Sequence, residues 1–193
     1  GWLGLVEEGG QGQDLNGDGD REDGVYQLFR PELGTVEPLG FSLNTNRATN
    51  LPHANERYLL LPIEESDGLD HNGDGDQLDI LWGIYDMLLH EAHETGIVRA
   101  FLSSVPGFLG DTVALCAWEL AQGADLNGDG LVRDFVLHLF RDGVVENTGL
   151  DTWSFAQGAG GLLTLGRSEG LVDLDWNGDG DTEDQVLHLL DLE

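Results

Sequence analysis

The chain has 193 residues, of which 40% are hydrophobic, and its 37 acidic and 8 basic side chains give a formal net charge of −29. A chain of this size and hydrophobicity can bury a real core and is not disordered by composition. It has no run of the roughly 20 apolar residues that a membrane helix needs, and its few basic residues exclude nucleic acid and anionic membrane surfaces as expected partners.

From the N-terminus, the first apolar run is WLGLVEE at residues 2–8, and an acidic loop, DLNGDGDRED, follows at residues 14–23. The same D-x-N-G-D-G-x-x-x-D frame returns at residues 70–79, 125–134 and 175–184. The first aspartates of successive loops lie 56, 55 and 50 residues apart. Self-similarity at this period indicates a repeat architecture.

Each loop lies between two runs of strand-like composition. The runs before the loops are WLGLVEE, RYLLLPIEE, TVALCAWE and GLLTLGRSE, and those after them are GVYQLFR, ILWGIYD, FVLHLFR and QVLHLLD. Later runs such as GTVEPLGFSL give about four strands per repeat. We therefore predict a single all-β repeat domain over 1–193, with repeats at about 1–45, 46–103, 104–151 and 152–193. Only YDMLLHEAHE at residues 85–94 resembles a helical turn.

The loops place carboxylate and amide oxygens at alternate positions, which suits a hard cation with about six to eight oxygen ligands. Glycines at the fourth and sixth positions allow the tight turn that makes these side chains converge. The seventh position can bind through its backbone carbonyl, which permits Leu131 there, and the tenth is always aspartate. No histidine or cysteine cluster accompanies the loops, so zinc and copper fit poorly. Magnesium usually keeps several waters, and calcium is therefore favoured.

We predict about four calcium ions per chain. A glutamate six positions before each first aspartate is expected to bind the ion or to support its ligands. The four sets are Glu8, Asp14, Asn16, Asp18, Asp20 and Asp23; Glu64, Asp70, Asn72, Asp74, Asp76 and Asp79; Glu119, Asp125, Asn127, Asp129, Leu131 and Asp134; and Glu169, Asp175, Asn177, Asp179, Asp181 and Asp184. Because Cys116 is the sole cysteine, no intrachain disulfide can form, and metal would take over that stabilising role in a secreted domain.

These loops resemble the D-x-[DN]-x-D-G calcium loops of several families. An EF-hand would need flanking helices and a glutamate at the twelfth position, where this chain has Val25, Leu81, Val136 and Val186. The loops are more similar to those of integrin-α (FG-GAP) propeller blades, which join two strands, although the last carboxylate of those loops usually stands at the ninth position. The resemblance implies a four-bladed calcium-binding β-propeller. The alternative is an open stack of β-hairpins, in which the two ends do not meet.

The sequence carries little sign of catalysis. HEAHE at residues 90–94 is one residue short of the H-E-x-x-H zinc motif. His138 and His188 share one repeat position, and we interpret them as partly buried structural residues. The chain has no G-x-S-x-G, P-loop or C-x-x-C motif. We therefore predict that the protein is not an enzyme.

We expect a secreted or cell-surface bacterial protein with a structural or adhesive role, in which calcium stabilises each repeat. The alternative is a calcium-dependent module that binds carbohydrate or protein, where an exposed tryptophan such as Trp176 would stack on sugar. The first repeat lacks its leading strand and the last lacks its trailing one, which has two interpretations. The chain is a fragment of a longer protein, or its open strand edges form calcium-dependent homo-oligomers by strand addition through the terminal strands, extending into filaments.

Overall fold

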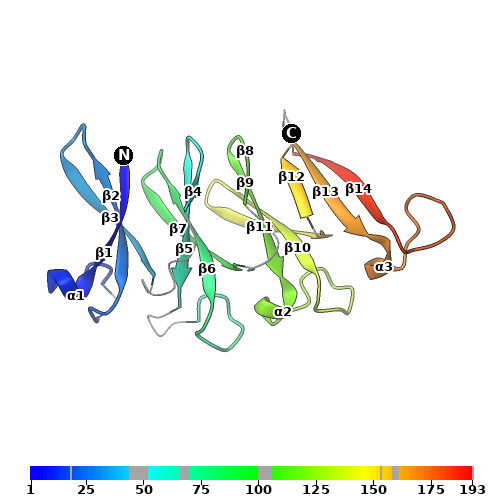
Figure 1. Ribbon diagram of the computed structural model, residues 1–193, viewed down its shortest axis with the longest axis horizontal. Helices are drawn as coiled ribbons and strands as arrows, with labels where there is room; N and C mark the ends of the chain where they lie inside the picture. The colour runs from blue at the N-terminus through cyan, green and yellow to red at the C-terminus, as the bar shows by residue number, and fades with distance from the viewer. Residues whose placement is uncertain are drawn as a thin grey trace. The chain divides into compact units, whose positions relative to one another are not determined.

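The computed structural model describes residues 1–17, 19–43, 52–65, 70–99, 106–152, 154–157 and 161–192. Four antiparallel sheets form the fold, and the prediction of an all-β chain is confirmed. The chain divides into two compact units, Gly1–Gly96 and Ile97–Glu193, whose elements are labelled in Figure 1. Each sheet falls within one of the four sequence repeats.

The first unit holds the first and second sheets. The first sheet has the order β1-β2-β3, with β1 at Trp2–Glu7, β2 at Gly24–Arg30 and β3 at Thr35–Leu43. The second has the order β4-β5-β6-β7, with β4 at His53–Ala54, β5 at Tyr58–Glu64, β6 at Ile80–Asp86 and β7 at Glu91–Val98. The last strand, β7, ends just inside the second unit.

The second unit holds the third and fourth sheets. The third sheet has the order β11-β10-β9-β8, with β8 at Gly107–Leu109, β9 at Thr112–Trp118, β10 at Phe135–Arg141 and β11 at Val144–Asp151. The fourth has the order β12-β13-β14, with β12 at Ser154–Gln157, β13 at Leu162–Ser168 and β14 at Gln185–Asp191. In the described part of the chain the sheets therefore have three, four, four and three strands, close to the four per repeat that we predicted.

Every acidic loop connects the two strands of one hairpin, as the flanking apolar runs predict. The hairpins are β1–β2, β5–β6, β9–β10 and β13–β14, all antiparallel. Their last pairs before the loops are Glu7 with Gly24, Glu64 with Ile80, Trp118 with Phe135 and Ser168 with Gln185. Four equivalent loops thus begin at the same register of four equivalent hairpins.

The core of the first unit lies between its two sheets. Tyr26 and Leu28 of β2 belong to one buried cluster with Leu61 of β5 and with Leu81 and Tyr85 of β6. Alternate side chains of a strand point to opposite faces of its sheet, so these residues define one inner face on each sheet. Complete burial of such a side chain stabilises the fold by about 1.5–3 kcal/mol. The two sheets therefore pack face to face.

The second unit repeats this packing. Leu137 of β10 joins Leu163 and Leu165 of β13 in a buried cluster, and the partly buried Leu139 and Leu190 pack against it. The leading sheet again presents the third and fifth residues of the strand that follows its acidic loop, and the trailing sheet presents the sixth residue of the strand that follows its own loop. Face-to-face packing within each unit agrees with the stack of hairpins that we considered as an alternative fold.

A glycine at the centre of β6 is explained by this packing. Gly83 stands at the repeat position that holds His138 and His188 in later copies. A Cβ atom added to Gly83 would lie 2.9 Å from Cγ2 of Ile63 and 3.1 Å from the Phe41 ring. Since Phe41 and Ile63 are both buried, a larger side chain would force the first and second sheets apart.

The short helices differ from our expectation. Helical turns occur at α1 (Glu8–Gln11), α2 (Glu119–Gln122) and α3 (Glu169–Val172), each directly after the first strand of a hairpin. The helix-like segment 85–94 instead forms the end of β6, a turn and the start of β7. A four-residue turn is too short to produce a helical periodicity in sequence. Among the described residues, no helix is long and apolar enough to span a membrane.

Candidate metal centres

The four acidic loops fold in the same way around their first aspartate. One oxygen of this side chain accepts a hydrogen bond of 2.5–2.7 Å from the amide of the glycine at the fourth position. The other oxygen accepts one of 2.9–3.2 Å from the glycine at the sixth position. All eight glycines have φ between 78° and 104°, where a side chain would be strained. The aspartates are Asp14, Asp70, Asp125 and Asp175.

The third and fifth positions continue the turn. Oδ1 of Asn72 accepts the amide of Asp74 at 3.1 Å, and Oδ1 of Asp74 accepts the amide of Asp76 at 3.0 Å. The third and fourth loops make the same two contacts. In the first loop, Asp18 lies outside the described residues. These local turns give the alternate oxygen-bearing side chains one conformation that recurs from loop to loop.

A buried glutamate lies under the first, third and fourth loops. Glu8, Glu119 and Glu169 begin the three helical turns and are 0% exposed. Oε1 of each accepts amide hydrogens from the second and third loop residues, which for Glu119 are Leu126 at 2.6 Å and Asn127 at 3.3 Å. Oε2 of each is buried and receives no hydrogen bond from the described residues. Such an oxygen is destabilising unless a cation or a proton accompanies it.

In the second loop, the structure places Glu65 where we predicted Glu64. Glu64 ends β5 opposite Ile80. The amide of Glu65 instead donates to the carbonyl of Asp79 at 3.3 Å, the contact that the equivalent glutamates make in the other loops. Oε1 of Glu65 accepts the amide of His71 at 2.8 Å, and Oε2 accepts the amide of Asp79 at 3.2 Å.

The reason for the shift is loop length. The second loop has one residue fewer between its glutamate and its first aspartate, so a fixed count of six positions falls inside the strand. A signal was available in the sequence. The apolar run before the second loop ends in Glu64-Glu65, so the sequence offers two candidates for one position.

Among the described residues, two groups of carboxylates have the spacing of a metal site. The oxygen atoms of Glu65, Asp76 and Asp79 lie within 4.8 Å of one another, and so do those of Glu169, Asp181 and Asp184. Each group combines the upstream glutamate with the seventh and tenth loop positions. Neither contains histidine or cysteine, and purely oxygen ligands suit calcium or magnesium rather than zinc or copper.

The tenth aspartate of the third loop is buried without compensation. Asp134 is 1% exposed, and neither of its carboxylate oxygens receives a hydrogen bond from the described residues. Burial, together with the nearby charges of Asp129 and Glu119, raises the pKa of Asp134 to about 6. Burial and the charge of Asp74 likewise raise the pKa of Asp79 to about 6. A bound cation would lower both pKa values and relieve this repulsion.

The fourth loop shows the same repulsion at its surface. The Asn177 hydrogen bond lowers the pKa of Asp184, but the neighbouring Asp179 raises it, and the net shift is upward. Asn177 Nδ2 donates to Asp184 at 2.9 Å and to Asp179 at 3.2 Å. One amide group thus bridges two like charges, at the third, fifth and tenth positions of the predicted ligand set.

The seventh position tolerates an apolar residue for a visible reason. The Leu131 side chain is 41% exposed, and the amide of Leu131 donates to Oδ1 of Asp129 at 2.7 Å. A leucine side chain offers no ligand atom, so Leu131 can contribute only its backbone carbonyl. At the same position Asp20, Asp76 and Asp181 accept the amide of the residue two places on.

The HEAHE segment forms no metal cluster among the described residues. It lies in the turn before β7 and in β7 itself, so its histidines do not share a helix face. Nδ1 of His90 lies 3.5 Å from Glu37, whereas Glu94 pairs with Nδ1 of His71 at 2.7 Å. The two ends of the segment therefore contact different parts of the first unit.

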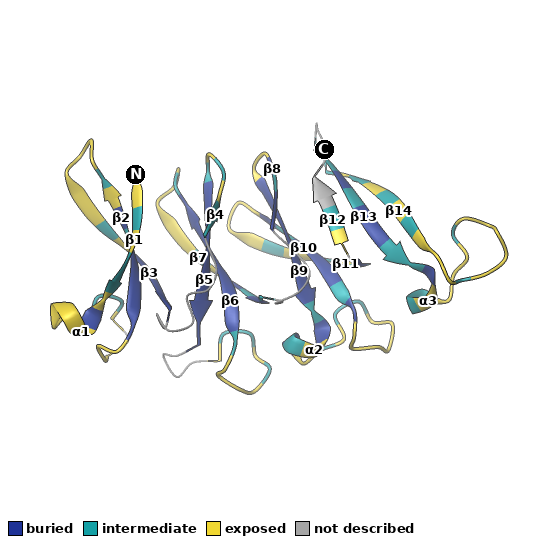
Figure 2. Cartoon of the chain, viewed as in Figure 1, coloured by how far each residue is buried: buried dark blue, intermediate teal, exposed yellow. Residues whose placement is uncertain are grey.

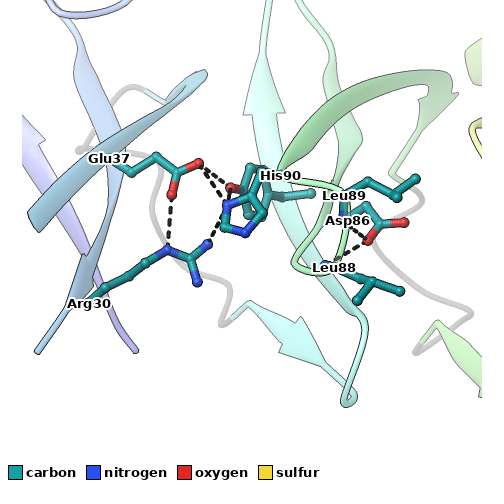
Figure 3. A network of polar contacts seen from close by, with 7 residues as sticks. Arg30, Glu37, Asp86, Leu88, Leu89 and His90 are labelled. Carbon is teal, nitrogen blue, oxygen red and sulfur yellow. Dashed lines mark hydrogen bonds and ion pairs between the residues drawn. The ribbon is translucent and has the colours of Figure 1, made fainter. Parts of the chain in front are cut away.

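His90 belongs to a polar network between the first and second sheets (Figure 3). The Tyr85 hydroxyl donates to Glu37, and Nε of Arg30 donates to the same carboxylate at 3.1 Å. Burial and the Glu37 contact raise the pKa of Tyr85 to about 12. These contacts hold β3 against β6, and the tyrosine stays protonated, which indicates a structural role.

The surroundings of Trp176 differ from our expectation of an exposed ring. Trp176, in the fourth loop, is partly buried. The guanidinium of Arg167 lies 4.4 Å from the centre of its ring, and the ring of His188 meets it edge-on at 4.8 Å. Trp2 is the more accessible, at 72% exposed.

No protein-family model, curated protein or solved structure matches the chain. The loops and the buried acids beneath them are therefore the features of the chain that bear on its function.

Proposed function

We propose that this chain is a calcium-dependent structural β-repeat domain in which each acidic loop binds one Ca²⁺ ion. The ion would lie between the glutamate at the end of one strand and the loop that leads into the next. It would hold the two strand ends together and neutralise the loop. Its role is structural, and no bond is made or broken there.

The observation that carries the proposal is the buried, unpaired Oε2 atom of Glu8, Glu119 and Glu169. An unpaired charge in the interior is destabilising by several kcal/mol in real proteins. Among the described residues, the same atom is left without a donor in three separate loops, and in the fourth loop the glutamate also lies within a group of carboxylates with Asp181 and Asp184. A hard cation is the partner that such an oxygen lacks, and the loop supplies the additional oxygen ligands.

The proposed ligand set follows the loop positions. It consists of the upstream glutamate, the side chains of the first, third, fifth and tenth positions, and a side-chain or backbone oxygen of the seventh. Glu65 replaces Glu64 in the second set, and the other three sets are those predicted from the sequence. The acid groups around Asp79 and Asp184 support the inclusion of the tenth position, which an EF-hand loop does not use in this way.

The setting follows from the chemistry of the ion. Extracellular calcium modules bind with dissociation constants on the order of 10⁻⁴–10⁻³ M, a range in which extracellular calcium keeps the sites filled. A domain that depends on such sites suits a secreted or cell-surface protein with a structural or adhesive role. Four ions would still leave the chain strongly acidic.

For the arrangement of the repeats, we propose an open stack of hairpins rather than a β-propeller ring. Two sheets pack face to face within each unit, and the outer faces of the first and fourth sheets carry exposed apolar side chains, as a stack of hairpins would leave them.

Isothermal titration of metal-free protein with calcium tests the proposal. We expect about four ions per chain, with magnesium binding more weakly. The variant Glu119→Gln should lose one ion, because it removes the buried anionic ligand of one site. An exposed acid outside the loops, Glu146, provides the matched control Glu146→Gln, which should bind as the parent does. No uptake of calcium, or a stoichiometry near one, would refute the proposal.

A further inference from the structure

The fourth sheet has an apolar outer face that its own unit does not cover. Leu187 and Leu189 of β14 are 77% and 67% exposed, while Leu190 packs on the other face against the core of the second unit. Residues two apart on a strand share a face, so the two leucines form one surface, here named the tail face. Figure 2 shows the resulting alternation of exposed and partly buried residues along β14.

The first sheet has a matching outer face. Trp2, Phe29 and Val36 are 72%, 41% and 57% exposed. Trp2 pairs with Phe29 across β1 and β2, and Val36 pairs with Phe29 across β2 and β3. Directly opposed residues of neighbouring strands point to the same side. The three side chains therefore form a row across the sheet, here named the head face.

The contact between the two sheets of each unit shows which strand positions pack against each other. In the first unit, Tyr26 and Leu28 of the leading sheet pack with Leu81 and Tyr85 of the trailing sheet. Counted from the tenth loop aspartate, these are the third and fifth residues of one central strand against the second and sixth of the next. In the second unit, Leu137 is the third residue of β10 and Leu190 is the sixth residue of β14, and both belong to one apolar contact.

The exposed residues of the two outer faces stand at the same strand positions as the residues in these contacts. Leu187 and Leu189 are the third and fifth residues of β14, the positions of Tyr26 and Leu28. Phe29 is the sixth residue of β2, the position of Tyr85. The tail face thus has the pattern of a leading sheet and the head face that of a trailing sheet.

We propose that the tail face of one chain binds the head face of a second copy of the chain. The contact continues the sheet-on-sheet packing that each unit already contains. It joins different surfaces on the two partners, so each bound copy still offers one free face and the assembly can extend as an open filament. This contact uses sheet faces, unlike the strand-edge pairing predicted from the sequence.

The net charge of the chain determines how its association depends on ionic strength. Copies with a formal charge of −29 repel each other, and this repulsion weakens with ionic strength. Association should therefore strengthen with added salt whether or not calcium is bound. A measurement of this salt dependence therefore tests the docking proposal independently of the calcium proposal.

The test is analytical ultracentrifugation over a range of protein concentrations. The double variant Leu187→Glu and Leu189→Glu should weaken association by about a hundredfold or more, since 1.4 kcal/mol per buried position corresponds to tenfold. The matched control is Leu88→Glu with Leu89→Glu, in an exposed turn of the second sheet, which adds the same charge and should associate as the parent does. Circular dichroism should show all variants folded, because the substituted side chains are exposed.

A mixing experiment tests the polarity of the contact. Trp2→Glu with Phe29→Glu blocks the head face and should also give monomers. A mixture of the head-blocked and tail-blocked variants should form one-to-one dimers and nothing larger, because each retains one intact face. Dimers of either blocked variant alone would indicate a symmetric contact and overturn the proposal. Unchanged association would indicate strand-edge pairing, and a parent chain that stays monomeric would refute self-docking; both outcomes also overturn it.

Discussion

The second and third acidic loops carry the same frame but treat their buried acids differently. In the second loop both oxygens of Glu65 accept backbone amides, and Asn72 Nδ2 donates to Asp79 at 3.0 Å. In the third loop Oε2 of Glu119 and both oxygens of Asp134 receive no hydrogen bond from the described residues. The two loops thus hold similar charge with unequal numbers of donors.

If the loops bind calcium as proposed, this difference predicts that they depend on it unequally although they share one sequence frame. A buried acid that accepts amides is partly stabilised by the protein itself. One without donors relies on a cation. We therefore expect the third loop to lose order before the second when calcium is removed, and the following predictions test that contrast.

Removal of calcium should have the largest effect. At about ten times the dissociation constant, each site stabilises the fold by about 1.4 kcal/mol, and four independent sites by about 5–6 kcal/mol. This approaches the roughly 5–15 kcal/mol of a whole domain. Thermal melts with and without EDTA measure the effect, and hydrogen exchange should show the third loop opening first. Equal melting temperatures in both buffers would contradict the prediction.

Neutralising Glu65 and Glu119 in turn should show different effects on stability in the second and third loops. Glu119→Gln should reduce stability by about 1–3 kcal/mol in calcium, because it removes a ligand, and should raise stability in EDTA, because it removes a buried charge whose Oε2 atom has no donor among the described residues. Glu65→Gln should reduce stability by about 1–3 kcal/mol in both buffers, because it also disrupts an amide contact that forms without metal. Urea titrations of both variants give the comparison. If both respond to EDTA in the same way, the contrast between the loops is wrong.

The pH dependence of the metal-free protein should reflect the crowded aspartates. The pKa of Asp134 is about 6 in the folded chain against an ordinary value of 3.8. The folded state therefore binds the extra proton between these values, and the free energy of unfolding decreases as the pH rises through that window. In EDTA, the melting temperature should be higher at about pH 4.5 than at about pH 7.5, because the folded chain raises the pKa of both Asp134 and Asp79.

The effect of Asp134→Asn on the melting temperature should have opposite signs with and without calcium. Without metal it removes a buried charge and should raise the melting temperature at about pH 7.5 while flattening the pH profile. With calcium it removes a ligand and should lower the melting temperature. The same substitution at the surface, Asp111→Asn, serves as the control and should change neither. A loss of stability in both buffers would show that Asp134 has a role other than metal binding.

The smallest effect is expected at the seventh position. Leu131→Ala should change stability and calcium affinity by less than about 0.5 kcal/mol, because the side chain is exposed and only the backbone carbonyl is available as a ligand. Calorimetry of the variant checks this. A clear loss of calcium affinity would mean that the leucine side chain shapes the third site.

The sequence alone determined the parts of this protein that depend on neighbours in the chain. Runs of strand-like composition on both sides of each acidic loop predicted the strands of the hairpins. The paired glycines of each loop fixed the turn, since few other residues adopt their positive φ. The spacing of Asp125, Asn127 and Asp129 predicted an oxygen-lined loop, and the structure gives the equivalent loops the same internal hydrogen bonds.

Tertiary structure decided what depends on register and on contact between sheets. Glu65 takes the position predicted for Glu64, because strand pairing rather than residue count sets where the chain leaves β5. Gly83 is required by the closeness of the first and second sheets. Leu187 is exposed although the buried Leu137 occupies the same repeat position. Each residue is locally equivalent to its counterpart in another repeat, and they differ only because burial is a property of what the rest of the chain places against them.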